Sequence, residues 1–196
     1  MLIRVLPAQE IVNASVPSQF NIEAQMACET EMLREMGARE IFSGKGYEVL
    51  VGVARAYGRV TPHVYIFPDS LNMSYIAAST AVDGRGKIVV GQQAIELFDT
   101  FALKGFLGHE MAHLVSDDAA QGCNDYILRN PQMEANADAL AARTLGKEPV
   151  KAFLQRVLAF THNQNWDAKH RLKVLQSRPT IHSVTKGRKT QAASGV

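Results

Sequence analysis

The sequence predicts an α+β fold that is mainly helical and contains a small mixed sheet. Two observations carry this prediction. Apolar residues recur at three-and-four spacing over most of the chain, and β-rich runs bounded by proline, glycine and asparagine are confined to its middle part. The chain has 196 residues, of which 46% are hydrophobic. This is enough for one globular domain with a sizeable core.

Two helices are expected before the sheet. Ser18 can cap the first, which continues on apolar positions until Gly37 ends it. The second covers residues 46–57, with Gly58 as the C-terminal breaker. Both have the pattern of helices that cover a core.

Three runs are expected to form the sheet. "HVYIFP" (63–68) is β-rich and lies between prolines, and His63 at its start is expected to have a structural role. "NMSYIAAST" (72–80) and "KIVVG" (87–91) flank "VDGRG", whose Asp-Gly pair predicts a hairpin turn. The second and third strands should therefore be antiparallel.

The pattern then returns to helix. Helices are predicted over residues 92–98 and 100–116. Asn130 and Pro131 form a cap and first turn for a helix that ends at Gly146, Pro149 opens another to about Thr161, and Asp167 is expected to cap the last one through "AKHRLKVLQ".

We expect a single domain over residues 1–176, made of an N-terminal helical cover (1–45) and a core (46–176). Residues 177–196 have little periodicity and are expected to form a basic C-terminal tail. Charge supports this division. Residues 169–196 contain seven basic residues and no acid, so the remainder has a net charge of 14 − 19 = −5.

The start of the chain lacks the basic region and apolar run of a signal peptide, and no uncharged apolar stretch approaches the ~18 residues of a membrane span. A cytoplasmic protein with no membrane partner is expected, and its oligomeric state is left open.

Cys28 and Cys123 are far apart and belong to no CxxC pair. They predict neither a disulfide framework nor a metal knuckle.

The stretch "GFLGHEMAH" (105–113) contains an HExxH pattern. On a helix, residues four apart lie one above the other, so His109 and His113 can direct two ring nitrogens at one ion, at about 2.0–2.1 Å from each. Glu110 is turned by about 100° from His109. It can take a proton from a metal-activated water, as the general base of a metallohydrolase does. A chance match to HExxH in such a chain is about a 1% event.

A zinc hydrolase needs a third protein ligand and a position left for water. Glu134 is the candidate, because it lies 21 residues after His113 in the first turn of the helix that begins at Pro131. Asp138, one turn further on the same face, can accept the second ring N–H of a ligand histidine. Its alternative is an ordinary surface acid, but the alanines around it favour tight packing.

HEMAH followed by "EANAD" (134–138) resembles the HExxH and ExxxD pair of the gluzincin metallopeptidases that include the heat-shock protease HtpX and the CAAX prenyl endopeptidases. The similarity covers roughly residues 46–175 and includes the helix and strands before the HExxH helix. It implies a zincin-like domain with one Zn²⁺ per chain, bound by His109, His113 and Glu134, with Glu110 as the base. It also implies that an edge strand pairs with an extended substrate, through Asn72, Met73, Ser74 and Tyr75.

The chain departs from that family in two ways. Members often carry long membrane helices, which this sequence lacks. Members also often show Thr or Ser, His and Pro before an Arg-Ile helix near the metal, whereas this chain has Thr161 and His162 without proline, then Arg171 and Leu172. His162 as a transition-state donor or masking ligand therefore stays open. His170 and His182 are its alternatives.

The expected function is zinc-dependent endopeptidase activity on unfolded or extended polypeptides. A donor to the developing oxyanion is needed, and the candidates are Tyr126, His162 and Arg171. One alternative is a metal-stabilised binding or chaperone module without turnover. A nucleic-acid-associated protein is a weaker alternative, because no aromatic residue interrupts the basic C-terminal segment. The basic tail could also fold over the cleft and restrain the enzyme.

Overall fold

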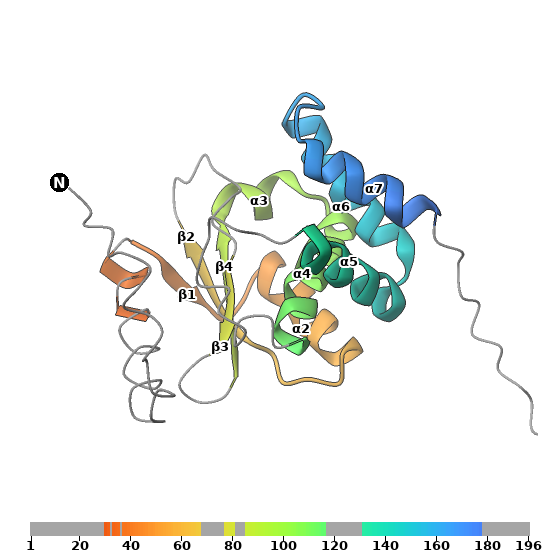
Figure 1. Cartoon of the computed structure of the whole chain (residues 1–196). Coiled ribbons are helices and arrows are strands. Elements are labelled where there is room, and N and C mark those ends of the chain that lie inside the picture. Colours follow the sequence, from red (N-terminus) through yellow and green to blue (C-terminus); the bar gives the residue numbers. More distant parts are fainter. Residues whose placement is uncertain are drawn as a thin grey trace, which may run out of the picture.

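The computed structural model describes residues 30–67, 77–80, 85–116 and 131–177, except 32 and 36, and gives the backbone alone for 77–80 and 166. A sheet forms one side of the molecule and helices form the other (Figure 1). The predicted α+β class is confirmed. The core lies between the helix-facing side of the sheet and the helices, and it includes Leu50, Val64, Ile88, Leu103, Phe106 and Leu154.

The sheet has four strands in the order β1-β2-β4-β3: β1 (Arg39–Ile41), β2 (His63–Phe67), β3 (Ala77–Thr80) and β4 (Gly86–Gly91). β2 and β4 are parallel, whereas β1 and β3 run antiparallel to their neighbours. The sheet is therefore mixed, with β3 at one edge. The expected antiparallel pairing of β3 with β4 is confirmed, whereas the predicted Asp-Gly turn between them lies outside the described residues. β1 was not predicted, because three residues are too few to show a periodic pattern.

Six helices of the described residues match the predicted ones: α2 (Lys45–Ala56), α3 (Gln92–Leu97), α4 (Thr100–Val115), α5 (Pro131–Leu145), α6 (Lys147–Phe160) and α7 (Trp166–Ser177). Of the helix expected between Ser18 and Gly37, the described residues within 30–35 are helical. Its start lies outside the described residues, as do residues 178–196 of the expected tail.

Two predicted helix starts were wrong. α6 begins at Lys147, before Pro149, because Gly146 takes a φ of 92° and reverses the chain directly after α5. α7 begins at Trp166, and the Oδ1 of Asn165, not the side chain of Asp167, accepts the hydrogen bond from the Ala168 N–H at 2.9 Å. Asp167 lies in the first turn of α7. Because its side chain does not cap the helix, its carboxylate can contact Arg171.

α4 lies at the centre of the molecule, between the sheet and α2 on one side and α5 and α6 on the other. Two glycines allow its close contacts. A Cβ at Gly105 would lie 2.0 Å from the carbonyl oxygen of Pro149, and one at Gly108 would lie 2.2 Å from Cδ1 of Leu145. The helix that carries the HExxH pattern is therefore packed against the α5–α6 junction at backbone distance.

The opposite face of the sheet carries a smaller cluster made of Ala38, Tyr65 and Val89. His63 lies on this face with its Nδ1 2.5 Å from Oε1 of Glu40, across β1 and β2. This contact agrees with the structural role expected for His63.

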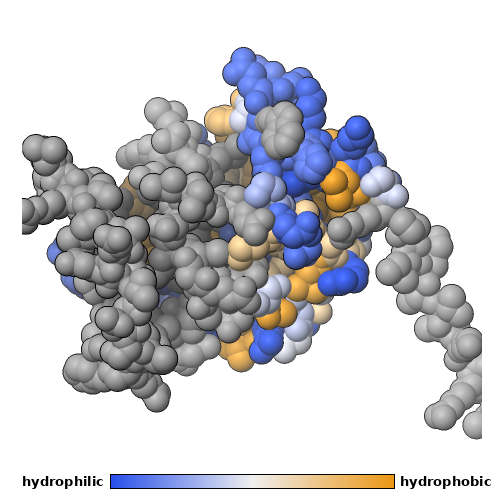
Figure 2. All heavy atoms as spheres, viewed as in Figure 1, coloured by the Kyte–Doolittle hydropathy of each residue, from blue (hydrophilic) through white to orange (hydrophobic). Residues whose placement is uncertain are grey.

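The described surface over the α6–α7 turn, at the top of the view, is mainly hydrophilic (Figure 2). Among the described residues, none of the helices combines the length and apolar composition that a membrane crossing requires.

We predict that Gly105→Ala destabilises the protein by about 1–3 kcal/mol, the usual range for overpacking a core. The added methyl group would meet backbone atoms of Pro149, which cannot move without shifting α6. Gly52→Ala is the matched control, because nothing lies within 4 Å of a Cβ in the middle of α2. That change should be neutral or stabilising. Urea unfolding of both variants measures the difference, and equal stabilities would contradict the packing of α4 on the α5–α6 junction.

Candidate metal centre

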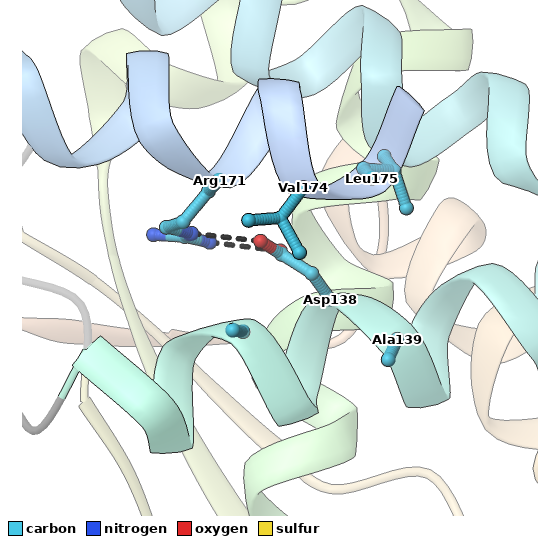
Figure 3. A pocket seen from close by; sticks show the side chains of 6 residues that line it. Asp138, Ala139, Arg171, Val174 and Leu175 are labelled. Atoms are coloured by element: carbon cyan, nitrogen blue, oxygen red, sulfur yellow. Dashed lines mark hydrogen bonds and ion pairs between the residues drawn. The ribbon is translucent and has the colours of Figure 1, made fainter. Parts of the chain in front are cut away.

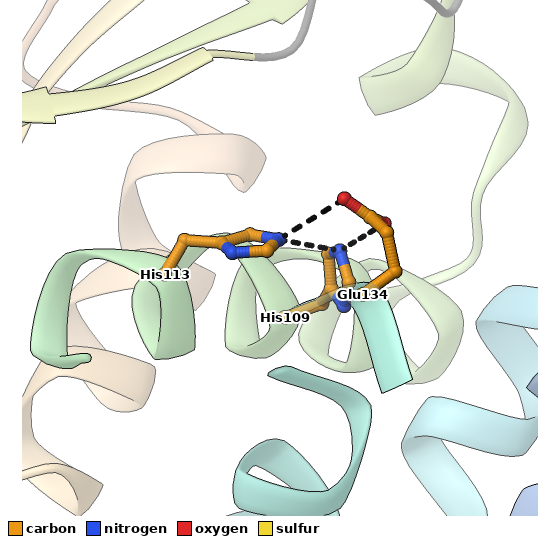
Figure 4. Close-up of side chains that lie close together, drawn as sticks. All are labelled: His109, His113 and Glu134. Carbon is orange, nitrogen blue, oxygen red and sulfur yellow. Dashed lines mark hydrogen bonds and ion pairs between the residues drawn. The ribbon is translucent and has the colours of Figure 1, made fainter. Parts of the chain in front are cut away.

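α4 and α5 bring three side chains with metal-binding atoms together (Figure 4). His109 and His113 lie one turn apart on α4, and Glu134 comes from the first turn of α5. Nε2 of His109 lies 3.1 Å from Nε2 of His113 and 3.2 Å from Oε2 of Glu134. Nε2 of His113 lies 3.5 Å from Oε1 of Glu134. The structure thus brings together all three residues predicted as metal ligands.

These separations can be compared with those around a tetrahedral ion. Ligand atoms bound at about 2.0–2.1 Å in tetrahedral geometry are about 3.3 Å apart. The three measured separations lie on either side of this value, and the two that involve Glu134 end on different carboxylate oxygens. Two imidazoles and one carboxylate therefore lie close enough together to hold a metal ion with three protein ligands.

The group is buried, but not equally on all sides. The side chains of His109 and Glu134 are 2% and 7% exposed, whereas that of His113 is 15% exposed. Glu110 is buried beside His109 on α4, and its carboxylate is near enough to His113 to act on the pKa of that ring. A buried carboxylate beside the predicted ligands is the arrangement that a general base requires.

Asp138 lies on α5, one turn after Glu134, and contacts His109. Its Oδ1 is 2.9 Å from Nδ1 of His109, the ring nitrogen that does not face the other ligands. A hydrogen bond there fixes the ring orientation and leaves Nε2 available to a metal. Asp138 is thus placed where the prediction requires it.

Arg171 of α7 contacts Asp138 of α5 (Figure 3), and it also contacts Glu134 of the same helix. Its Nε and Nη2 donate to the two oxygens of Asp138 at 2.7 and 2.8 Å, and its Nη1 donates to Oε2 of Glu134 at 2.8 Å. Nη1 also donates to Asp167 at 3.2 Å. Because most of its donors are engaged by carboxylates, Arg171 is placed to hold Glu134 and Asp138. Donation to a substrate oxygen would break one of these bonds.

The surroundings of Arg171 are apolar. Its guanidinium carbon lies 6.0 Å from the centre of the Phe153 ring, and the His109 ring lies 5.9 Å from the same ring. Behind Asp138 and Arg171 is a cavity of about 10 Å³, lined also by small and aliphatic residues: Ala135, Ala139, Val174 and Leu175. The ion pairs of Arg171 with Glu134 and Asp138 are thus shielded from solvent, which strengthens both of them.

The electrostatics of the cluster favour cations. Burial acts to raise the pKa of Asp138, but hydrogen bonds from Arg171 and His109 outweigh it and lower that pKa to about 2. For Glu134, burial is likewise outweighed by hydrogen bonds to both histidines, which hold its pKa far below the usual range. Both carboxylates are therefore ionised over the physiological range of pH.

The other predicted site residues are placed differently. His162 is exposed in the α6–α7 turn with a φ of 49°, and His170 is exposed on α7. Neither belongs to the group of metal-binding atoms found among the described residues. The remaining candidates lie outside the described residues: Asn72, Met73, Ser74, Tyr75, Tyr126 and His182. Cys28 and Cys123, for which no role was predicted, also lie outside them.

Two residues of the centre were not predicted to belong to the site. Asp167 supports Arg171, and its spacing of four residues on one helix was a signal that could have found it. Tyr57 donates a hydrogen bond to the carbonyl of Gly108, 51 residues away in the chain, and no local pattern indicates such a contact.

No protein-family model matches the chain, and neither the curated proteins nor the solved structures give a match. The resemblance to the gluzincin metallopeptidases therefore depends on the sequence motifs alone.

We predict that Arg171→Met destabilises the protein by about 3–5 kcal/mol, the cost of removing one partner from a buried ion pair. The change would leave Glu134 and Asp138 buried without their cation. Arg156→Met is the control, because Arg156 pairs with Asp99 at the exposed surface and should contribute much less. Thermal and urea unfolding measure both. Equal losses would contradict a special role for the buried pair.

A second prediction concerns pH. In metal-free protein, burial and the charge of Arg171 lower the pKa of His109, but hydrogen bonds to Asp138 and Glu134 outweigh them and raise it to about 9. The pKa of His113 is also raised. A histidine whose pKa is higher in the folded than in the unfolded state stabilises the fold. This contribution is complete below the unfolded pKa of about 6.5 and is lost as the pH rises through the folded pKa of about 9.

The free energy of unfolding of chelator-treated protein should thus fall between pH 6.5 and 9, and His109→Asn should reduce that slope. Urea unfolding at several pH values measures it. A stability that is flat or rises over this range would contradict the assignment.

Proposed function

We propose that the protein is a zinc-dependent endopeptidase with a zincin-like domain. The observation that carries this proposal is the triangle of His109, His113 and Glu134, with separations that fit a tetrahedral ion. The buried Glu110 lies directly beside it. The HExxH and ExxxD motifs support the same class.

The donor set fits zinc. Zn²⁺ is a borderline-soft ion that binds both imidazole nitrogen and carboxylate oxygen, and three protein ligands are typical of catalytic rather than structural zinc sites. When bound, the ion would supply Lewis acidity, which acidifies water and polarises a carbonyl group. His109, His113 and Glu134 would hold it.

The chain's own residues would carry out the proton transfers. Glu110 would take a proton from the attacking water and return it to the leaving amine, which a carboxylate can do in both directions. Asp138 would keep His109 in the tautomer that presents Nε2. Arg171 would hold the carboxylate of Glu134 and neutralise part of the buried charge. This assignment makes Arg171 a positioning residue for the reaction.

The edge of the sheet offers a place for the substrate. β3 pairs only with β4 among the described strands, and it lies beside α4, which carries the histidines. An edge strand can bind an extended peptide through its backbone N–H and C=O groups, with little dependence on sequence. This supports unfolded or extended polypeptides as substrates. The predicted substrate-binding residues 72–75 lie outside the described residues. A cytoplasmic location remains part of the proposal.

We predict that Glu110→Gln retains zinc at one ion per chain but lowers the rate of casein cleavage by at least about 100-fold, because general base catalysis contributes 10²–10⁴-fold. Glu148→Gln, on the exposed side of α6, is the control and should cleave normally. Glu134→Gln should lose zinc as well as activity. Metal content and cleavage are measured on the same samples.

The three variants separate the alternatives. Zinc binding without cleavage in the wild type would favour a metal-stabilised binding module. Cleavage that survives Glu110→Gln would remove the proposed mechanism, and a folded wild type without any metal would remove the site.

A further inference from the structure

Tyr57, the residue that ends α2, contacts the backbone of the metal-binding helix. Its hydroxyl donates to the carbonyl oxygen of Gly108 at 2.7 Å. Gly108 directly precedes His109. In a continuous α-helix the same carbonyl accepts the N–H of Ala112, which directly precedes His113. The hydroxyl of Tyr57 therefore bonds to the carbonyl at the start of the helical turn that separates His109 from His113.

This bond constrains the direction of the His109 side chain. A carbonyl oxygen has two lone pairs and can accept a second donor, but a donor from outside the helix tilts the peptide plane toward it. The plane between Gly108 and His109 fixes where the Cα–Cβ bond of His109 points. Removing the phenol oxygen would let this plane relax toward ordinary helix geometry.

Tyr57 also touches the helix that supplies the third ligand. Its hydroxyl interacts with the side chain of Thr144 on α5. On α4, a Cβ at Gly108 would meet Leu145 and Ala141 of that same helix. Burial raises the pKa of Tyr57 well above its ordinary value, so the phenol stays protonated and remains a donor over the whole working range of pH. The hydroxyl thus lies where α2, α4 and α5 meet.

We infer that Tyr57 is a positioning residue for the metal site, which sets the angle between the His109 and His113 rings through the Gly108 carbonyl. This inference rests on the proposed function, since it requires that the histidines bind a metal. The hydroxyl acts on the backbone of α4 and touches neither metal nor substrate.

The test uses Co²⁺ in place of zinc in the full chain, because the visible absorption of Co²⁺ reports ligand geometry. Tyr57→Phe removes one oxygen and keeps the ring. Tyr65→Phe is the matched control, because it removes a hydroxyl that bonds to Glu40 on the far side of the sheet. Both variants lose one hydrogen bond and should lose similar stability, but only Tyr57→Phe should change the site.

We predict that Tyr57→Phe shifts or weakens the visible Co²⁺ bands and raises the Kd for Co²⁺ by about 3- to 10-fold, as expected for one lost hydrogen bond. Tyr65→Phe should leave both unchanged. Measurements are made well below the melting temperature of each variant. If Tyr57→Phe is not folded at 25 °C, the comparison is repeated for all proteins in a stabilising osmolyte.

A Tyr57→Phe protein with the wild-type spectrum and Kd would overturn the inference, and so would an equal change in Tyr65→Phe. These outcomes differ from a failure of the proposed function. In that case the wild type itself would give no Co²⁺ spectrum, or it would bind Co²⁺ and cleave nothing.

Discussion

The pairing of Arg171 with two buried carboxylates is the interaction on which the rest of the site depends. Glu134 and Asp138 lie one turn apart on α5 in an apolar environment, where unpaired charges would be very unfavourable. Arg171 meets both at hydrogen-bond distance and brings α7 against α5. Asp138 in turn orients His109. One guanidinium therefore connects α7, the last described helix, to the ring of His109.

Much of the fold could be predicted from the sequence because its signals are local. Six of the helices described here and the antiparallel pairing of β3 with β4 follow from apolar spacing and from turn residues such as Gly146. The errors also have local causes. β1 is too short to show a periodic pattern. Asn165 and Asp167 could both cap α7 by residue type, and only the geometry of the turn determines which side chain accepts the hydrogen bond.

The site could be predicted in part, for a related reason. His109, Glu110 and His113 have a fixed spacing on one helix, and Glu134 and Asp138 have another, so their chemistry can be read from the chain. Tertiary packing decides how α7 approaches α5. The sequence therefore could not show which carboxylates accept the hydrogen bonds of Arg171. Tyr57 was missed because its contact with Gly108 joins residues 51 positions apart.

The order in which the chain is synthesised gives the Arg171 contact a further consequence. Arg171 follows His109 by 62 residues, and it belongs to the last described helix. On the ribosome, α4 and α5 emerge before the cation that neutralises their carboxylates. Until α7 docks, Glu134 and Asp138 of a nascent chain lack the guanidinium that pairs with them in the folded protein. The buried group of His109, Glu134 and Asp138 therefore acquires its neutralising partner only after Arg171 has been synthesised.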